Sequence, residues 1–177
     1  MELITRRLIL RAWQEQDAED LYRYAKDPEV GIPAGFCAHT SVQKSLEVIR
    51  SVLTRPGVYA VCLKEDRCAI GSIGLYRSDI AEKKDECELG YWLAKPYWGK
   101  GIITEAAQEI IRHAFAELKL QRVWCGYYDG NVKSRRVMDK LGFVYHHTNE
   151  GIEVKAVNEI RTGHVMLLTR KAWNKIK

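Results

Sequence analysis

The sequence predicts a mixed α/β fold, in which one mostly antiparallel sheet of about seven strands carries helices on both faces. Short apolar runs that read as strands follow one another in the first half of the chain, which favours antiparallel pairing. A strand–helix–strand succession in the second half favours one parallel pair. A length of 177 residues is enough for one domain with a real core, so we expect a single domain over residues 1–177.

The chain opens with a short strand and two helices. An apolar run predicts a strand over residues 7–13, and apolar residues at helical spacing predict a helix over residues 15–25. Two prolines and two glycines predict a loop over residues 27–39. Thr40 begins a capping-box pattern, which predicts a second helix that ends at Pro56-Gly57.

Three strands and the clearest helix of the chain follow. We expect strands over residues 58–63 and 68–75, joined by a hairpin turn, and a third strand over residues 86–94. From Ile103 to Leu118, apolar residues recur at intervals of three and four, which is typical of a helix with one buried face.

The remaining elements alternate before a final pair of strands. A strand is expected over residues 122–127 and a helix over residues 131–141, followed by a helix-ending Gly142. Two last strands are expected over residues 143–147 and 164–169.

Composition argues against several classes of protein. No apolar run approaches the roughly 18 residues of a membrane helix, and charges near the N-terminus argue against a signal peptide, so we expect a cytoplasmic protein. The net charge of +5 is spread along the chain, which suits an anionic ligand but argues against nucleic acid. The cysteines lack metal-binding spacing, so we expect no metal and buried thiols in a reducing compartment. These cysteines are Cys37, Cys62, Cys68, Cys87 and Cys125.

The most informative segment is Trp98-Gly99-Lys100-Gly101, which joins a strand to the clearest helix. Glycines allow a sharp turn, and the first N–H groups of a helix lack internal partners, so the junction suits a phosphate. A Walker A loop would need Ser or Thr where Gly101 stands, and a dinucleotide fingerprint would need glycine where Thr104 stands. A plain strand–helix turn remains the alternative.

A second segment has a similar form. Asn131 opens a helix as an N-cap residue, Ser134 follows three residues later, and Leu141-Gly142-Phe143 close the helix. By itself, this pattern is equally typical of an ordinary capped helix.

Together, the two segments resemble the GNAT superfamily of N-acetyltransferases, and most closely the branch that acetylates the N-termini of ribosomal proteins. The resemblance extends from Arg6 to about Thr169. It rests on an ordered set of short motifs: Thr5-Arg6-Arg7-Leu8-Ile9-Leu10-Arg11, Glu88-Leu89-Gly90-Tyr91-Trp92-Leu93, Trp98-Gly99-Lys100-Gly101-Ile102, Thr104-Glu105-Ala106, Asn131-x-x-Ser134 and Lys140-Leu141-Gly142-Phe143.

Three positions depart from the superfamily pattern. Trp98 stands where Gln or Arg is usual, and Ile103 where Gly or Ala is usual, but neither change removes a backbone donor. Met138 stands where many members carry the Tyr that protonates the departing thiolate, and methionine cannot donate a proton.

The resemblance implies that acetyl-CoA is the co-substrate and that its acetyl group passes directly to a primary amine, either a protein N-terminus or a small molecule. It further implies that the strands over residues 86–94 and 122–127 splay apart to admit the pantetheine arm. Lys133 and Arg135 could face the adenosine phosphates, although solvation is commoner for helix-surface cations. The residues implied in cofactor binding are Trp92, Leu93, Ala94, Trp98, Gly99, Lys100, Gly101, Ile102, Ile103, Thr104, Asn131 and Arg136.

Two catalytic residues are implied as well. Glu88 is the candidate for the base that takes the amine proton, and Glu86 shares its strand face by period-two geometry. A solvated strand carboxylate remains the alternative for Glu88. Ser134 is the candidate donor to the leaving thiolate.

The acceptor is not fixed by any motif, and a monomer and a homodimer are both compatible with the sequence. A non-catalytic acyl-CoA-binding sensor or assembly module is the alternative function, because the usual Tyr is absent at Met138. An acetyltransferase acting on charged tRNA is disfavoured by the unclustered charge. No membrane partner is expected.

Overall fold

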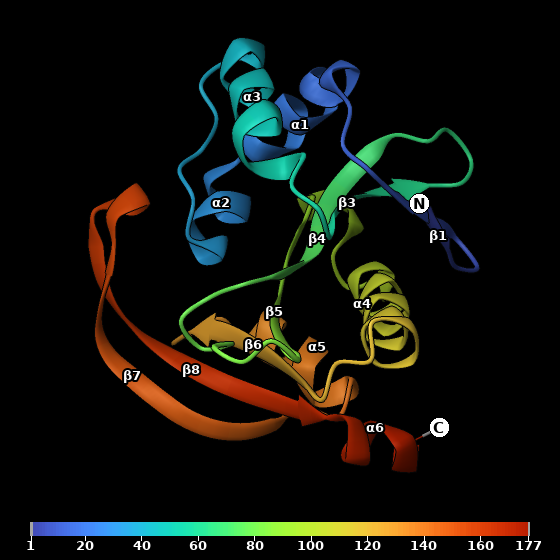
Figure 1. Ribbon diagram of the computed structural model, residues 1–177. Coiled ribbons are helices and arrows are strands. Elements are labelled where there is room, and N and C mark those ends of the chain that lie inside the picture. The colour runs from blue at the N-terminus through green and yellow to red at the C-terminus, as the bar shows by residue number, and fades with distance from the viewer. Residues whose placement is uncertain (1, 177) are drawn as a thin grey trace. The chain divides into compact units, whose positions relative to one another are not determined.

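The computed structural model describes residues 2–176 and shows a mixed α/β fold with a mixed eight-stranded sheet (Figure 1). Hydrogen-bonded strands follow the order β1-β2-β3-β4-β5-β6-β8-β7. The chain divides into two compact units. Unit 1 holds the chain up to Gly74 and Tyr91–Glu109, and unit 2 holds Leu75–Gly90 and the chain from Ile110. β4, β5 and helix α4 each begin in one unit and end in the other.

The strands of unit 1 pair antiparallel, as expected. Strand β2 (Leu8–Arg11) lies between the two-residue β1 (Leu3–Ile4) and β3 (Val58–Leu63), and β3 pairs with β4 (Ala69–Tyr76). Every residue of β2 is buried, which explains why its apolar run was visible in the sequence. β1 was not predicted, since two residues carry no periodicity.

Besides the first part of α4, unit 1 holds α1, α2 and α3. A 3₁₀ turn (Glu15–Asp17) leads into α1 (Ala18–Ala25), which confirms the helix expected there. Helix α3 (Val42–Val48) continues as a π-helical turn (Ile49–Leu53). Its cap is Ser41, whose side chain accepts from the Lys44 N–H, and not Thr40 as the capping-box pattern suggested.

The prediction of a loop over residues 27–39 was wrong, because α2 (Pro28–Ala34) lies within it. Asp27 caps this helix by accepting the Glu29 N–H, and Pro28 stands in the first turn, where no N–H is needed. Gly35 ends the helix. Two of the residues interpreted as helix breakers, Pro28 and Gly35, are therefore its start and stop signals, whereas Gly31 and Pro33 lie inside the helix.

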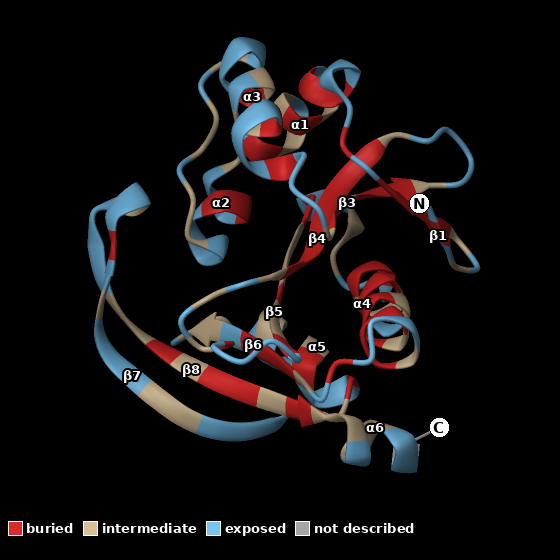
Figure 2. Ribbon diagram, in the orientation of Figure 1, coloured by how far each residue is buried: buried red, intermediate tan, exposed pale blue. Residues whose placement is uncertain are grey.

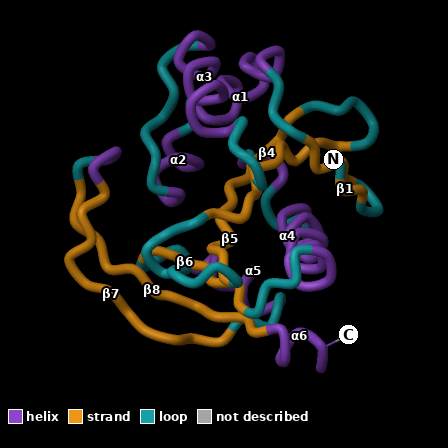
Figure 3. The backbone as a smooth tube through the Cα atoms, in the orientation of Figure 1, coloured by secondary structure: helices purple, strands orange, loops and turns teal. Residues whose placement is uncertain are grey.

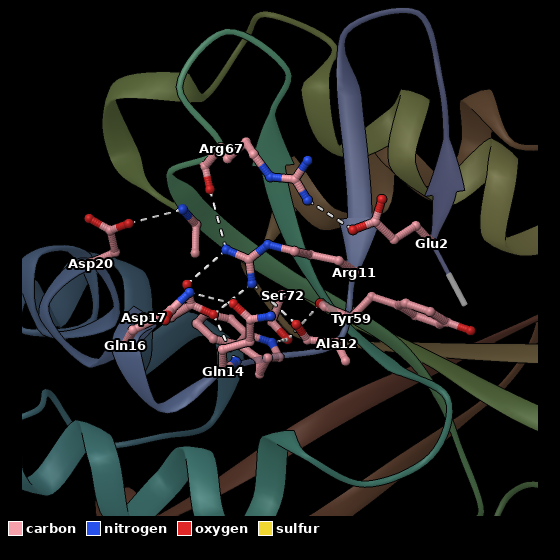
Figure 4. A network of polar contacts seen from close by, with 12 residues as sticks. Glu2, Arg11, Ala12, Gln14, Gln16, Asp17, Asp20, Tyr59, Arg67 and Ser72 are labelled. Atoms are coloured by element: carbon pink, nitrogen blue, oxygen red, sulfur yellow. Dashed lines mark hydrogen bonds and ion pairs between the residues drawn. The ribbon is translucent and has the colours of Figure 1, made fainter.

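Unit 1 is tied together by a buried ion pair between β2 and the first helical segment. Both Nη atoms of Arg11 donate to the Asp17 carboxylate at 2.7 Å, and the Gln14 N–H donates to the same carboxylate (Figure 4). The hydrogen bonds to Asp17 raise the pKa of Arg11 against the opposing effect of burial. The Ser72 hydroxyl of β4 accepts from the indole N–H of Trp13.

Unit 2 contains a parallel pair of strands. The first part of β5 (Glu86–Leu93) runs parallel to β6 (Arg122–Tyr128), as the strand–helix–strand pattern predicted. Helix α4 (Ile102–Arg112) precedes β6 and continues as a π-helical turn (His113–Glu117). A long connection over residues 77–85 precedes β5 (Figure 3).

The last two strands of unit 2 are much longer than predicted. β7 (Val144–Val154) and β8 (Glu159–Thr169) form an antiparallel hairpin. Figure 2 shows that β7 is largely exposed while much of β8 is buried. The strands were underestimated because β7 carries exposed polar residues, and because two register shifts between β7 and β8 interrupt the alternation of apolar and polar residues that predicts a strand. Helix α5 (Val132–Lys140) was predicted, whereas the C-terminal α6 (Arg170–Ile176) was not.

Candidate active site

In unit 1, the glycine-rich junction forms an open turn at the start of α4. Gly99 and Gly101 have φ angles of 74° and 71°, a left-handed conformation that other residues rarely adopt. Apart from the two neighbours of Gly99 in the chain, a Cβ atom at this position would meet no atom within 4 Å, so the space beside this point of the turn is open. The turn therefore has the backbone geometry and the open surface that an anion site needs.

The helix beyond this turn presents unpaired amide groups by its own geometry. The Glu105 N–H makes the first intrahelical hydrogen bond, to the Gly101 carbonyl. Three N–H groups, from Ile102 to Thr104, thus lack intrahelical acceptors. The side chains of Ile102 and Ile103 are buried, so the isoleucine that departs from the family pattern serves the core.

Backbone groups at the end of β5 already have partners within unit 1. The Ala94 N–H donates to the Ile70 carbonyl at 2.8 Å, and the Leu93 carbonyl accepts from the indole N–H of Trp98 at 2.7 Å. Trp98 thus attaches the glycine turn to the strand. Because the Ala94 N–H and the Leu93 carbonyl already have partners in the chain, neither group is available to pair with the pantetheine amides. The other backbone groups of Trp92, Leu93 and Ala94 remain for the implied contact.

In unit 2, Glu88 lies where the parallel ladder ends. The β5–β6 register runs from Glu86 opposite Arg122 to Glu88 opposite Trp124. Glu88 is half-buried, and its Oε1 lies 3.8 Å from the position of a Cβ on Gly126, which belongs to the exposed part of β6. The carboxylate therefore lies beside the one exposed residue of β6, Gly126.

The surroundings of Glu88 favour its protonated form. Burial raises the pKa of Glu88 above its ordinary value, and the Asp79 carboxylate acts in the same direction. Ser78 opposes the shift more strongly than Asp79 supports it, but burial outweighs Ser78, and the net pKa of Glu88 is raised. A raised pKa makes the ionised carboxylate a stronger base toward the proton of an amine.

Glu86 is excluded as a second base by its contacts. Its Oε2 accepts from the indole N–H of Trp124 at 2.9 Å, and its Oε1 pairs with Arg122 at 2.8 Å. Burial raises the pKa of Glu86, yet these two hydrogen bonds outweigh burial, and the net pKa lies below its ordinary value. Glu86 is a buried structural carboxylate.

The N-terminus of α5 holds the other predicted residues in unit 2. Asn131 caps the helix, and its Oδ1 accepts from the Ser134 N–H at 3.1 Å. Ser134 is half-buried, whereas Arg136 is exposed. Met138 is fully buried, so at this position the chain has a core residue in place of a proton donor.

The cations of α5 lie at the surface. Lys133 and Arg135 are both exposed, and Arg135 faces Asp139 at 3.8 Å. Both side chains thus lie near the capped end of the helix. This position is compatible with a contact to the adenosine phosphates and with simple solvation.

Sequence reasoning missed two residues beside these groups. Gly126 was not singled out, although a glycine in a strand often marks a close approach. Arg7 appeared only within a motif, although it hydrogen-bonds to the carbonyl of Lys100 in the glycine turn.

A family profile described as "Acetyltransferase (GNAT) domain" matches residues 7–144, most of the chain. This chain belongs to the GNAT acetyltransferase family. The GNAT protein is therefore an acetyltransferase that uses acetyl-CoA as co-substrate.

Curated relatives agree with the family assignment. Uncharacterized N-acetyltransferase p20 of Bacillus licheniformis is 31% identical over 146 residues, which cover 80% of this chain and 81% of that protein. The provisionally assigned ribosomal N-acetyltransferase YdaF of Bacillus subtilis is 44% identical over 79 residues, 45% of this chain and 42% of that protein.

Solved structures show the same fold. A GNAT-family acetyltransferase from Bacillus anthracis superposes with a TM-score of 0.83 at 22% identity, covering 97% of this chain and 99% of that one. Ribosomal-protein-S5-alanine acetyltransferase from Vibrio fischeri has a TM-score of 0.72 at 19% identity, with 98% of each chain covered.

Other expectations from the sequence can be compared with the described residues. Among residues 2–176, no cluster of three or more His, Cys, Asp or Glu side chains could hold a metal ion. Within the same range, no helix is long and apolar enough to span a membrane. No cysteine is in a disulfide, and Cys62 and Cys125 are buried, but the prediction of buried thiols was wrong for the exposed Cys37.

Proposed function

We propose that this GNAT protein acetylates the N-terminal amine of a protein, by direct attack of that amine on acetyl-CoA. The observation that carries the proposal is the environment of Glu88, a half-buried carboxylate with a raised pKa beside the exposed backbone of Gly126. A small-molecule amine is the alternative acceptor within the same chemistry.

The cofactor side of the proposal rests on the glycine turn. Its amide groups from Gly99 to Thr104 would hold the diphosphate, with Lys100 adding a positive charge. Trp92, with the remaining backbone groups of Leu93 and Ala94, would receive the pantetheine arm. Asn131 would contact the pantetheine or thioester end, and Arg136 would face the adenosine phosphates.

The chemical step needs two proton transfers. As the amine nitrogen bonds to the acetyl carbon and the carbon–sulfur bond breaks, Glu88 would accept the amine proton, directly or through water. Ser134 would donate a hydrogen bond to the departing thiolate. This donor helps modestly, because a thiolate is already a tolerable leaving group at neutral pH.

The choice of a protein N-terminus as acceptor is supported by the relatives. The stretch shared with YdaF, which is provisionally assigned as a ribosomal N-acetyltransferase, has the highest identity of the comparisons described above. The motifs that resemble the ribosomal-protein branch agree with this assignment.

The test measures thiol release from acetyl-CoA with two sets of acceptors. One set contains peptides with free N-termini beginning with Ala or Ser, and the other contains small primary amines. We expect kcat/KM to be highest for a peptide and to vanish when its N-terminus is blocked. Preference for a small amine would overturn the acceptor, and CoA binding without turnover would favour the sensor function.

A further inference from the structure

Arg7 joins the N-terminal segment of unit 1 to the glycine turn. Its Nη1 donates to the Lys100 carbonyl at 3.0 Å, and its Nε donates to Glu105 Oε2 at 2.7 Å. Its Nη2 lies 3.7 Å from the position that a Cβ on Gly101 would occupy. One guanidinium group therefore contacts the turn, borders its second glycine and pairs with the first turn of α4.

Glu105 is held from three directions. The Thr5 hydroxyl and the Arg7 N–H both donate to its Oε1, at 2.6 and 2.8 Å, while the Arg7 side chain holds its Oε2. Burial raises the pKa of Glu105, but these three hydrogen bonds outweigh burial and keep the pKa below its ordinary value. The carboxylate is thus ionised at neutral pH, and the pair is charged on both sides.

This contact differs from the exposed ion pairs of the same unit. Arg50 and Glu15 are also 2.7 Å apart, but their side chains are 54% and 61% exposed. The Glu105 side chain is only 17% exposed, and Arg7 also binds a main-chain carbonyl in the turn. A partly buried pair with additional hydrogen bonds restricts its backbone far more than an exposed pair does.

We propose that Arg7, acting through Lys100 and Glu105, is a positioning residue that fixes the glycine turn in its diphosphate-binding conformation. The inference rests on the proposed binding of the diphosphate at that turn. A turn with two left-handed glycines has many accessible conformations when unrestrained. Holding one carbonyl of the turn and the first turn of α4 with the same guanidinium removes much of that freedom before the cofactor arrives.

The test compares cofactor affinity with turnover in the full-length protein. Arg7→Met removes the guanidinium contacts with the turn and keeps an apolar side chain of similar length. Arg7→Lys restores the positive charge but not the planar guanidinium that binds Lys100 and Glu105 together. We expect calorimetry to give a Kd for CoA raised about tenfold in Arg7→Met, the loss that one charge-assisted hydrogen bond typically causes, and raised less in Arg7→Lys. At saturating acetyl-CoA, kcat should stay within about twofold of wild type.

Two further variants separate positioning from a general loss of structure. Arg50→Met removes a pair of equal length elsewhere in unit 1 and should leave the Kd unchanged. In the double variant Arg7→Met/Glu105→Gln, the Kd should rise no more than in the worse single variant, because both residues act as one unit.

Three results would overturn the inference. These are a Kd of Arg7→Met within twofold of wild type, an equal loss in Arg50→Met, or a fall in kcat as large as the rise in Kd, which indicates misfolding. If wild-type protein binds no CoA, the proposed function fails as well; if wild type binds CoA and Arg7→Met binds it equally well, only the role of Arg7 fails.

Discussion

Glu86 and Glu88 lie two residues apart on the same face of β5, and their pKa values are shifted in opposite directions. Trp124 and Arg122 hold Glu86 ionised, whereas burial beside Asp79 favours protonation of Glu88. One strand thus carries a structural carboxylate and a carboxylate suited to proton transfer. Divergent environments of this kind separate such roles in other enzymes.

Replacing the proposed base should slow turnover without weakening cofactor binding. We expect Glu88→Gln to lower kcat/KM by about 10²–10⁴-fold, the usual contribution of a general base, since an amide cannot accept the amine proton. Thiol release measured across pH should also lose the acidic limb that ionisation of Glu88 produces. A variant that keeps this limb would assign it to another group.

The same substitution should stabilise the fold at higher pH. The pKa of Glu88 is higher in the folded state than in the unfolded state. The folded protein is therefore more stable when Glu88 is protonated than when it is charged. As pH rises through the folded pKa, the wild type loses stability that Glu88→Gln retains. The melting temperatures of the two proteins should therefore coincide below the unfolded pKa of this carboxyl group, separate between the unfolded and the folded pKa, and stay apart above the folded pKa, with the variant melting higher.

Removing the indole donor to Glu86 should destabilise unit 2. Trp124→Phe keeps most of the ring but leaves Oε2 of a buried carboxylate without its hydrogen bond, which costs about 1–3 kcal/mol. Urea denaturation measures this loss. The Kd for CoA should change little, and a large change would show that Trp124 has a role beyond holding Glu86.

The buried pair of unit 1 should be sensitive to the loss of one partner. The side chains of Arg11 and Asp17 are 8% and 5% exposed. Asp17→Asn leaves the Arg11 charge uncompensated, and the free energy of unfolding should fall by about 3–5 kcal/mol. Glu15→Gln, which breaks the exposed pair with Arg50, is the matched control and should leave the free energy of unfolding nearly unchanged. Comparable losses would contradict the burial argument.

A side chain at the glycine turn should weaken acetyl-CoA binding more than it destabilises the fold. Gly99→Val forces a β-branched residue to a φ of 74°, which costs roughly 1–3 kcal/mol or displaces the turn. Because the Cβ would meet no protein atom, the strain falls on the backbone donors alone. We expect a higher KM for acetyl-CoA and a melting temperature lowered by about 2–4 °C for each kcal/mol of strain that the turn keeps, measured by steady-state kinetics and thermal scans.

Most of the fold could be predicted because buried residues imposed clear periods on the sequence. The stripe from Ile103 to Leu118 and the run Leu8-Ile9-Leu10 correspond to α4 with its π-helical turn and to β2. The β7–β8 hairpin was underestimated because β7 is largely exposed and has no apolar face to mark it. α2 was missed because it holds prolines and glycines inside as well as at its ends, and these residues are typical of loops.

The candidate site was predictable only where a short motif carried it. The glycine turn and the Asn131 cap have local geometry that the sequence displays directly. The different fates of Glu86 and Glu88 depend on Trp124, Arg122 and Asp79, which no spacing along the strand reveals.

The bond between Arg7 and Glu105 joins residues 98 positions apart. Loop-closure entropy makes such a contact slow to form, so the turn it anchors is completed only once the start of the chain has docked. If Arg7 positions the turn as proposed, the affinity for CoA should rise during refolding as residues 5–7 dock, and a change near the N-terminus should alter CoA affinity at a turn about a hundred residues away.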